Sequence, residues 1–146
     1  MPNPPVHPQG GTWDSRRDAL AQWVDQCPEL PPLGYTPGNV FQADTAESPS
    51  VKPFIVIRWG DQIESMGLSG VWPVTLWVYD EFGDFNRATK MARDLGAYLA
   101  DNVVDFRTTS GRISQINNLG TGGDLADDGF DALVIPQNLR LIGRGD

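Results

Sequence analysis

Few residues of this chain could do chemistry, and they lie far apart. His7 is the one histidine among 146 residues, and it lies in a stretch rich in proline and glycine. A catalytic triad or a histidine-rich metal site needs an imidazole that a packed core holds in place. Because His7 lies outside any such core, we expect neither kind of site. Cys27, the one cysteine, shares a helical apolar face with Leu20 and Val24. That pattern is typical of a small buried side chain rather than a nucleophile. We therefore expect that the protein is not an enzyme.

A loop rich in glycine and aspartate, GTGGDLADDG at residues 120–129, could in principle bind phosphate or calcium. It lacks the GxxxxGK[ST] pattern of a phosphate loop, and its aspartates repel phosphate. It also lacks the D-x-D-x-D-G order with a later bidentate Glu that calcium loops use. We therefore expect no cofactor and no metal ion, and interpret the loop as solvated or as part of an interface.

Two tryptophans precede acidic residues, in WGD at residues 59–61 and in WVYD at residues 77–80. The pair could form a sugar-binding cluster, or the two rings could simply pack across neighbouring strands. No polar constellation accompanies them in the sequence, which favours packing between Trp59 and Trp77.

The composition excludes several classes of function. The net charge is −8 and the pI is near 4.4, whereas nucleic-acid binding requires clustered Lys and Arg. No apolar run approaches the ~20 residues of a membrane span, and the N-terminus lacks the pattern of a secretion signal. A single cysteine fits a reducing compartment. The length suits one domain, at residues 14–146, preceded by a flexible Pro/Gly-rich arm at residues 1–13.

Helices and strands follow from periodicity. Apolar spacing of three and four predicts helices over residues 14–27 and 84–103, begun by Asp14 and Asp84. β-branched and aromatic runs predict strands at residues 40–43, 54–59, 70–79, 112–119 and 132–142, the fourth with a bulge. The second and third of these strands should form a hairpin with a long exposed tip. The order predicts an α+β fold: a mostly antiparallel four- to five-stranded sheet with two main helices packed on one face.

Matched rows of apolar residues predict the core between helices and sheet. They are Leu20, Trp23, Val24, Val74, Leu76, Val78, Met91, Leu95, Leu99, Leu133, Ile135 and Leu139. Gly96 interrupts the second helix, where glycine costs about 1 kcal/mol relative to alanine. Close packing of the helix on the sheet would explain it, but so would chance.

The stretch GVWPVTLWVYDEFGD, residues 70–84, raises a further question. Its first row, with Trp72 and Val74, is apolar, as a buried face requires. The opposite row should be polar if it faces water, but its residues are Pro73, Thr75, Trp77 and Tyr79. Either a neighbouring subunit covers the second row, or the Pro-rich segment Glu29–Pro53 folds across it within one chain.

The order of these segments and their patterns of apolar and polar residues resemble those of the tail terminator proteins of long-tailed, non-contractile bacteriophages. The similarity lies in DSRRDALAQWVDQ, KPFIVIRWG, WPVTLWVYD, the helix DFNRATKMARDLGAYLADNV after an acidic turn, and the final strand GFDALVIPQNLRLIG. It spans residues 14–142 and depends on element order, not on an invariant motif. The arm and the connection at residues 29–53 have no counterpart.

The resemblance implies a non-catalytic virion protein of the tail or neck, assembled in the host bacterial cytoplasm. Such a subunit forms a homo-oligomeric ring, expected to be a hexamer, on the tail tube. The ring binds the major tail tube protein, ends tube polymerisation and joins the head–tail connector proteins, while DNA passes through without specific binding. A neck or head-completion protein of the same virion is one alternative, and a small ligand-binding domain is another.

Two sets of candidate residues follow from these readings. Apolar residues on the second face or at the hairpin tip are candidates for subunit or tube contacts: Ile63, Met66, Leu68, Trp77 and Tyr79. Two acidic groups are candidates for the wall of the DNA channel: Asp80, Glu81 and Asp84, and Asp124, Asp127, Asp128 and Asp131. Like-charge repulsion would keep DNA mobile there. The competing interpretation places both groups on the outer rim, with Asp84 as a helix cap only.

Overall fold

A computed structural model describes residues 15–43, 49, 51–66, 69–101, 106–107, 112–123, 125–127, 129 and 131–144. The helices in this part of the chain are α1 (Ser15–Asp25), the short 3-10 turn η1 (Pro31–Leu33) and α2 (Phe85–Asp101). The strands are β1 (Val40–Gln42), β2 (Phe54–Trp59), β3 (Glu64–Met66), β4 (Ser69–Asp80), β5 (Phe106–Arg107), β6 (Arg112–Thr121), β7 (Leu125–Asp127) and β8 (Ala132–Arg144). The predicted N-terminal arm and Asp14 lie outside the described residues.

One sheet holds all these strands, in the order β1-β2-β4-β8-β6-β5, with β3 added to β4 and β7 added to β8. Every pairing is antiparallel except β1 with β2. The predicted α+β class is confirmed, and so is the bulged strand, since the β6–β8 register shifts twice. The strand count exceeds the prediction because β3, β5 and β7 have only two or three residues each, too short to show a side-chain period.

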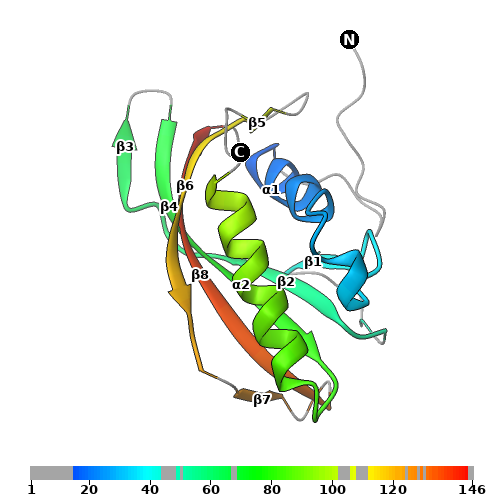
Figure 1. Ribbon diagram of the computed structural model, residues 1–146. Helices are drawn as coiled ribbons and strands as arrows, with labels where there is room; N and C mark the ends of the chain where they lie inside the picture. Colours follow the sequence, from blue (N-terminus) through cyan, green and yellow to red (C-terminus); the bar gives the residue numbers. More distant parts are fainter. Residues whose placement is uncertain are drawn as a thin grey trace.

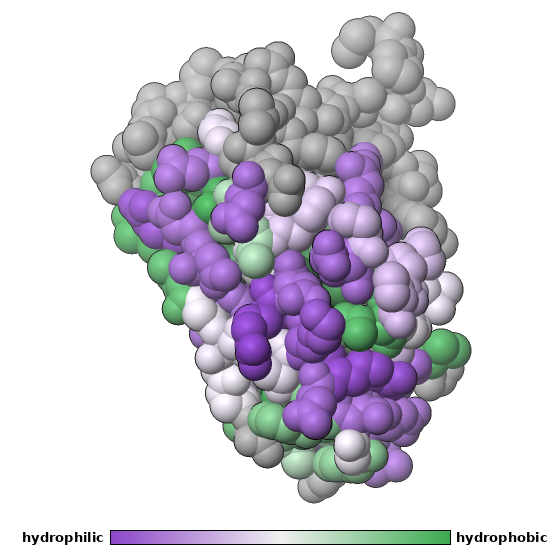
Figure 2. Space-filling view, viewed as in Figure 1, coloured by the Kyte–Doolittle hydropathy of each residue, from purple (hydrophilic) through white to green (hydrophobic). Residues whose placement is uncertain are grey.

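Both helices cover the same face of the sheet, as predicted (Figure 1). All twelve predicted core residues are buried between the helices and this face. The outward side of α2 is mostly hydrophilic, and hydrophobic residues gather toward the margins of this view (Figure 2). Burial of one apolar stripe per helix therefore accounts for the layer, as in other α+β domains.

The close approach of α2 to the sheet explains Gly96. A Cβ at this position would lie 2.5 Å from Gln137 Nε2 and 3.1 Å from Asn118 Nδ2. Gln137 is fully buried, and its amide is held at both ends: Nε2 donates to Asn118 Oδ1 at 2.6 Å, and Oε1 accepts from Thr121 Oγ1 at 2.5 Å. The helix can pack here because residue 96 has no side chain.

The predicted hairpin of β2 and β4 is present, and it is longer than the sequence indicated. β2 pairs with the second half of β4, from Trp59↔Val74 to Phe54↔Tyr79. After a break at Gly60, whose N–H donates to the Pro73 carbonyl at 2.8 Å, β3 pairs with the first residues of β4. The tip of the hairpin is thus a strand pair, and it projects beyond the helices (Figure 1).

Candidate interaction surface

The face of the sheet opposite the helices carries the second row of β4. Thr75, Trp77 and Tyr79 are half-buried there, and so is Pro73. By register, Val56 of β2 lies beside Trp77, and Pro136 of β8 lies on its other side. The two helices lie on the other face, so the described helices leave this face partly open (Figure 1).

Part of this face is covered from within the chain. Phe54, fully buried, stacks on Tyr79 with ring centroids 4.6 Å apart and an interplanar angle of 9°. Phe41 of β1 meets Phe54 edge-on at 6.1 Å. Phe41 belongs to the segment that the sequence offered as an intramolecular cover. β1 extends the sheet beside β2 and does not cross its face, so the cover of the second row by that segment stays a prediction.

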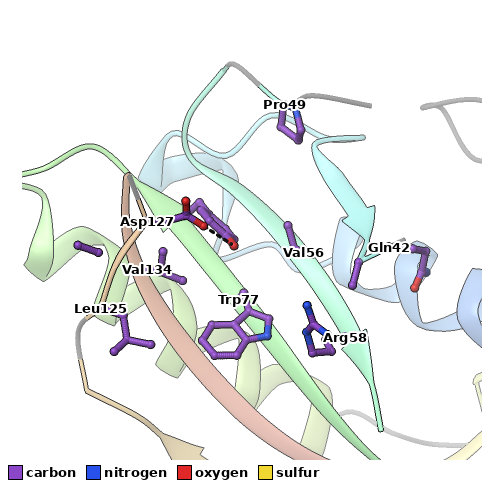
Figure 3. Close-up of a pocket in the computed structure, with 11 residues that line it drawn as sticks. Gln42, Pro49, Val56, Arg58, Trp77, Leu125, Asp127 and Val134 are labelled. Carbon is purple, nitrogen blue, oxygen red and sulfur yellow. Dashed lines mark hydrogen bonds between the residues drawn. The ribbon is translucent and has the colours of Figure 1, made fainter. Parts of the chain in front are cut away.

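A groove of about 350 Å³ occupies the open part of the face (Figure 3). Its floor and walls come from β2, β4, β7 and β8, with β1 at one end. The lining residues are Gln42, Ala43, Pro49, Val56, Arg58, Trp77, Tyr79, Leu125, Ala126, Asp127 and Val134. Apolar side chains predominate, and a few polar groups lie among them, which is the usual character of a binding groove.

Two polar features distinguish the groove. Tyr79 donates its hydroxyl proton to Asp127 Oδ2 at 3.4 Å, and burial together with this carboxylate raises the pKa of Tyr79. The indole Nε1–H of Trp77 is shielded from solvent and has no hydrogen-bond partner among the described residues. A shielded donor without an acceptor is costly, and a bound carbonyl oxygen would satisfy it.

The predicted contact between Trp59 and Trp77 is wrong. Trp59 pairs with Val74, in the row that faces the helices, and its Nε1–H donates to Gln42 Oε1 at 3.1 Å. Trp77 lies in the other row. Alternate residues of a strand point to the same face of a sheet. Trp77 is three residues from Val74, the partner of Trp59, so the two rings lie on opposite faces. Neither the sugar-binding cluster nor the packing of these two rings is therefore formed.

The first acidic group is largely used in structural contacts. Asp80 is fully buried and binds Arg87 through both carboxylate oxygens, and Asp84 Oδ2 lies 3.3 Å from Arg87 Nη2. The hydrogen bonds that Arg87 donates to Asp80 raise the pKa of Arg87. Glu81 is exposed, 3.9 Å from Lys52 Nζ. The Asp80 carboxylate is therefore not exposed at the surface of the chain.

In the second acidic group, Asp127 is half-buried beside Tyr79, and Asp131 is exposed with a φ of 49°. Asp124 and Asp128 lie outside the described residues. The structure therefore places the described members of this group on or beside β7, at the end of the sheet where β8 begins.

Among the candidate contact residues, Ile63 is 62% exposed at the hairpin. Met66 lies in β3, its side chain not described, and Leu68 is outside the described residues. The structure adds exposed apolar residues that the sequence analysis did not select: Val51, Phe82, Phe85, Leu119 and Leu125. Phe82 follows the acidic pair Asp80 and Glu81, a polar context that could have singled it out. Phe85, the first residue of α2, is 46% exposed.

No cluster of three or more His, Cys, Asp or Glu is arranged to hold a metal ion in the part of the chain that the structure describes. Neither α1 nor α2 has the length and apolar character of a membrane-spanning helix.

Comparison with known proteins gives a similarity of fold alone. No family model matches the chain, and no curated protein matches it. A chain in the solved structure of the virion of a native gene transfer agent particle has a TM-score of 0.66 and 18% identity, over 90% of this chain and 96% of that chain. A second solved chain is 16% identical over 89% of this chain and 95% of that one, but its TM-score of 0.47 carries no argument.

Proposed function

We propose that this chain is a structural protein of a phage-like virion and that it forms a ring, expected to be a hexamer, that caps the tail tube. The observation that carries the proposal is the shared fold with a chain of a gene transfer agent virion, which extends over nearly the whole of both chains. The terminator role itself comes from the resemblance in element order. In that role the subunit performs no catalysis.

A ring requires two different surfaces that meet head to tail. The chain offers two that are well separated. One is the β3–β4 hairpin, which projects past the helices and carries exposed Ile63 (Figure 1). The other is the open sheet face with Trp77 and Tyr79. Aromatic side chains at such positions are typical of interface cores. We assign both to contacts with neighbouring subunits or with the major tail tube protein.

The acidic residues beside β7 are the better candidates for the channel wall. Arg87 contacts both Asp80 and Asp84, and Lys52 lies 3.9 Å from Glu81, so two cations offset most of the charge of the three carboxylates at the end of β4. Asp131 is exposed, and Asp127 is half-buried in the lining of the groove. Repetition of these carboxylates around a ring would form a negative collar that lets DNA pass without binding it.

A neck protein that binds the portal side is the alternative role in the same virion. Electron microscopy of the purified protein, alone and mixed with assembled tubes of the major tail protein, separates the two. A terminator should form rings and occupy tube ends, so that added tube subunits no longer elongate them. Rings that bind connector proteins but leave tubes free to grow would favour the neck role. A protein that stays monomeric and binds neither would refute both.

A further inference from the structure

We propose that the groove beside Trp77 binds the proline-rich stretch at residues 2–8 of the same chain. This inference concerns the arm, for which the proposed ring assigns no role, and it does not depend on that ring. Within such a ring, a neighbouring subunit would meet the arm seated on Trp77 rather than the bare groove. It is argued from the chemistry of the groove, from the chemistry of the arm, and from the place where the arm leaves the fold.

The groove matches what a polyproline helix requires. Such a helix has no internal hydrogen bonds, so its carbonyl oxygens stay free, while its prolines supply no N–H donors. Grooves that bind it offer flat aromatic surface and donors for those carbonyls. Trp77 supplies the aromatic surface, because its half-buried ring lines the groove. Its Nε1–H is shielded from solvent and unpaired among the described residues, so it can donate to a bound carbonyl once the ring shifts. Val56, Val134 and Leu125 add apolar walls (Figure 3).

The arm matches what the groove offers. Four of the seven residues from Pro2 to Pro8 are proline. Such a segment favours the polyproline conformation in advance and loses little entropy on binding. The arm contains no Asp, Glu, Lys or Arg before Asp14, so it meets neither Arg58 nor Asp127 with a repulsive side chain.

The arm also leaves the fold next to the groove. α1 begins at Ser15, and in its first turn the Arg17 carbonyl accepts a hydrogen bond from Gln42 Nε2 at 3.3 Å. Gln42 lines one end of the groove. A second cavity of about 220 Å³, lined in part by Arg17, Ala43 and Arg58, lies beside that first turn. Ala43 and Arg58 line both cavities, which gives the chain a path around the end of β1.

The distance is within reach. Gln42 of β1 pairs with Ile57 of β2, and Ile57 pairs with Leu76 of β4, next to Trp77. Trp77 is therefore two strand spacings, or about 10 Å, from β1. The residues between Pro8 and Ser15 can span roughly 20 Å when extended. A segment tethered this closely has an effective concentration on the order of millimolar, so even weak intrinsic affinity fills the groove from within the chain.

Disulfide trapping in the full chain tests the proposal. Pro5→Cys is combined with Leu125→Cys, at the exposed rim of the groove, and Cys27 remains because it is buried. The matched control combines Pro5→Cys with Ala97→Cys, which is exposed on α2 at the opposite face of the sheet. Under mild oxidation the groove pair should form a monomeric disulfide at least about tenfold faster than the control pair. Both pairs share the same tether, but only binding in the groove holds residue 5 close to residue 125.

Equal rates in the two pairs would overturn the proposal. A disulfide-linked dimer that forms with the groove pair alone would also overturn it, and would assign the groove to the arm of a second copy.

A second measurement avoids new cysteines. The indole ¹H–¹⁵N resonance of Trp77, identified by its loss in Trp77→Phe, should shift in Pro4→Gly/Pro5→Gly. It should stay in place in Pro31→Ala/Pro32→Ala, which alters the exposed prolines of η1. An unchanged resonance in the arm variant would mean that the arm does not reach Trp77.

Discussion

At the scale of single residues, Gly96 shows why a helix accepts a poor helix former. Alanine at this position would gain up to about 1 kcal/mol of helix propensity. Its methyl group would, however, push Gln137 away from Asn118 and Thr121, which hold the buried amide at both ends. An unsatisfied buried amide costs more than the propensity gains.

We therefore expect Gly96→Ala to lower the free energy of unfolding by about 1–2 kcal/mol, because overpacking typically costs about 1–3 kcal/mol and the gain in helix propensity offsets part of that cost. Denaturant melts measure this. Ala97→Gly, on the exposed side of α2, is the control for propensity alone. In the double variant with Gln137→Ala, the total loss of unfolding free energy should be smaller than the sum of the two single losses by at least about 0.5 kcal/mol. A stabilised Gly96→Ala protein would contradict the close packing.

Tyr35 gives a residue-scale prediction in alkali. Its hydroxyl donates to Asp25 Oδ1 at 2.5 Å, and burial followed by the Asp25 charge raises the pKa of Tyr35. A folded pKa above the unfolded value of about 10 means that the stabilisation is complete below pH ~10 and is lost as the pH rises further. Tyr35→Phe should lose about 1–2 kcal/mol at pH 7 and show a shallower decline above pH 10. Parallel alkaline slopes for the two proteins would contradict this role.

At the scale of elements, the junction of β4 and α2 depends on a buried carboxylate. Asp80 ends the apolar row of β4 at 0% exposure, binds Arg87 of α2, and accepts the backbone N–H of Glu81 at 2.8 Å. The pair connects the last residue of the strand to the first turn of the helix. It therefore links the start of α2 to the end of β4.

Asp80→Asn should lower the free energy of unfolding by about 2–4 kcal/mol, because it leaves Arg87 with no buried counter-charge. The Arg87 side chain is 32% exposed and can rehydrate, which keeps the loss below that of a fully buried pair. Asp84→Asn is the matched control: Asp84 touches the same guanidinium but is 45% exposed, so we expect a loss under about 0.5 kcal/mol. Equal losses, measured by thermal and denaturant melts, would contradict the assignment.

At the scale of the whole molecule, the hairpin should act in assembly rather than in folding. Replacement of Ile63, Met66 and Leu68 by Ser should weaken ring formation and tube-end binding, because it removes apolar surface from an interface while leaving the core intact. Light scattering and electron microscopy measure assembly, and circular dichroism checks folding. The control triple, Asn86→Ser, Arg93→Ser and Ala97→Ser, alters the exposed side of α2. Unchanged rings and intact virions in the hairpin variant would refute the role.

The acidic group beside β7 should act on DNA passage. Reversal of Asp124, Asp127, Asp128 and Asp131 to Lys should leave folding intact but slow DNA ejection, because a positive collar holds phosphates within a screening length of about 8–10 Å. As the control for net charge, the smaller variant that reverses only Asp127 and Asp131 is compared with reversal of Glu29 and Asp101, near α2, which makes the same change in charge. Ejection at the normal rate from particles that carry the loop variant would count against a channel position.

Much of the fold was predictable from the sequence. Two helices, the hairpin, the bulged strand and all twelve core residues follow from local periodicity, because burial of one face imposes a repeat of 3.6 or 2 on the side chains. The short strands β3, β5 and β7 were missed because backbone pairing with a neighbour, and not a side-chain pattern, forms them.

The candidate site depended on tertiary structure to a greater degree. The sequence by itself determined that the second row of β4 is apolar, that the chain is acidic, and that a proline-rich stretch precedes α1. Register between distant strands decided that Trp59 and Trp77 lie on opposite faces, that Phe54 stacks on Tyr79, and that Leu125 and Asp127 enclose the same groove. Packing decided that Asp80 is bound to Arg87 rather than exposed. These outcomes depend on contacts between segments far apart in the chain, and no local period encodes them.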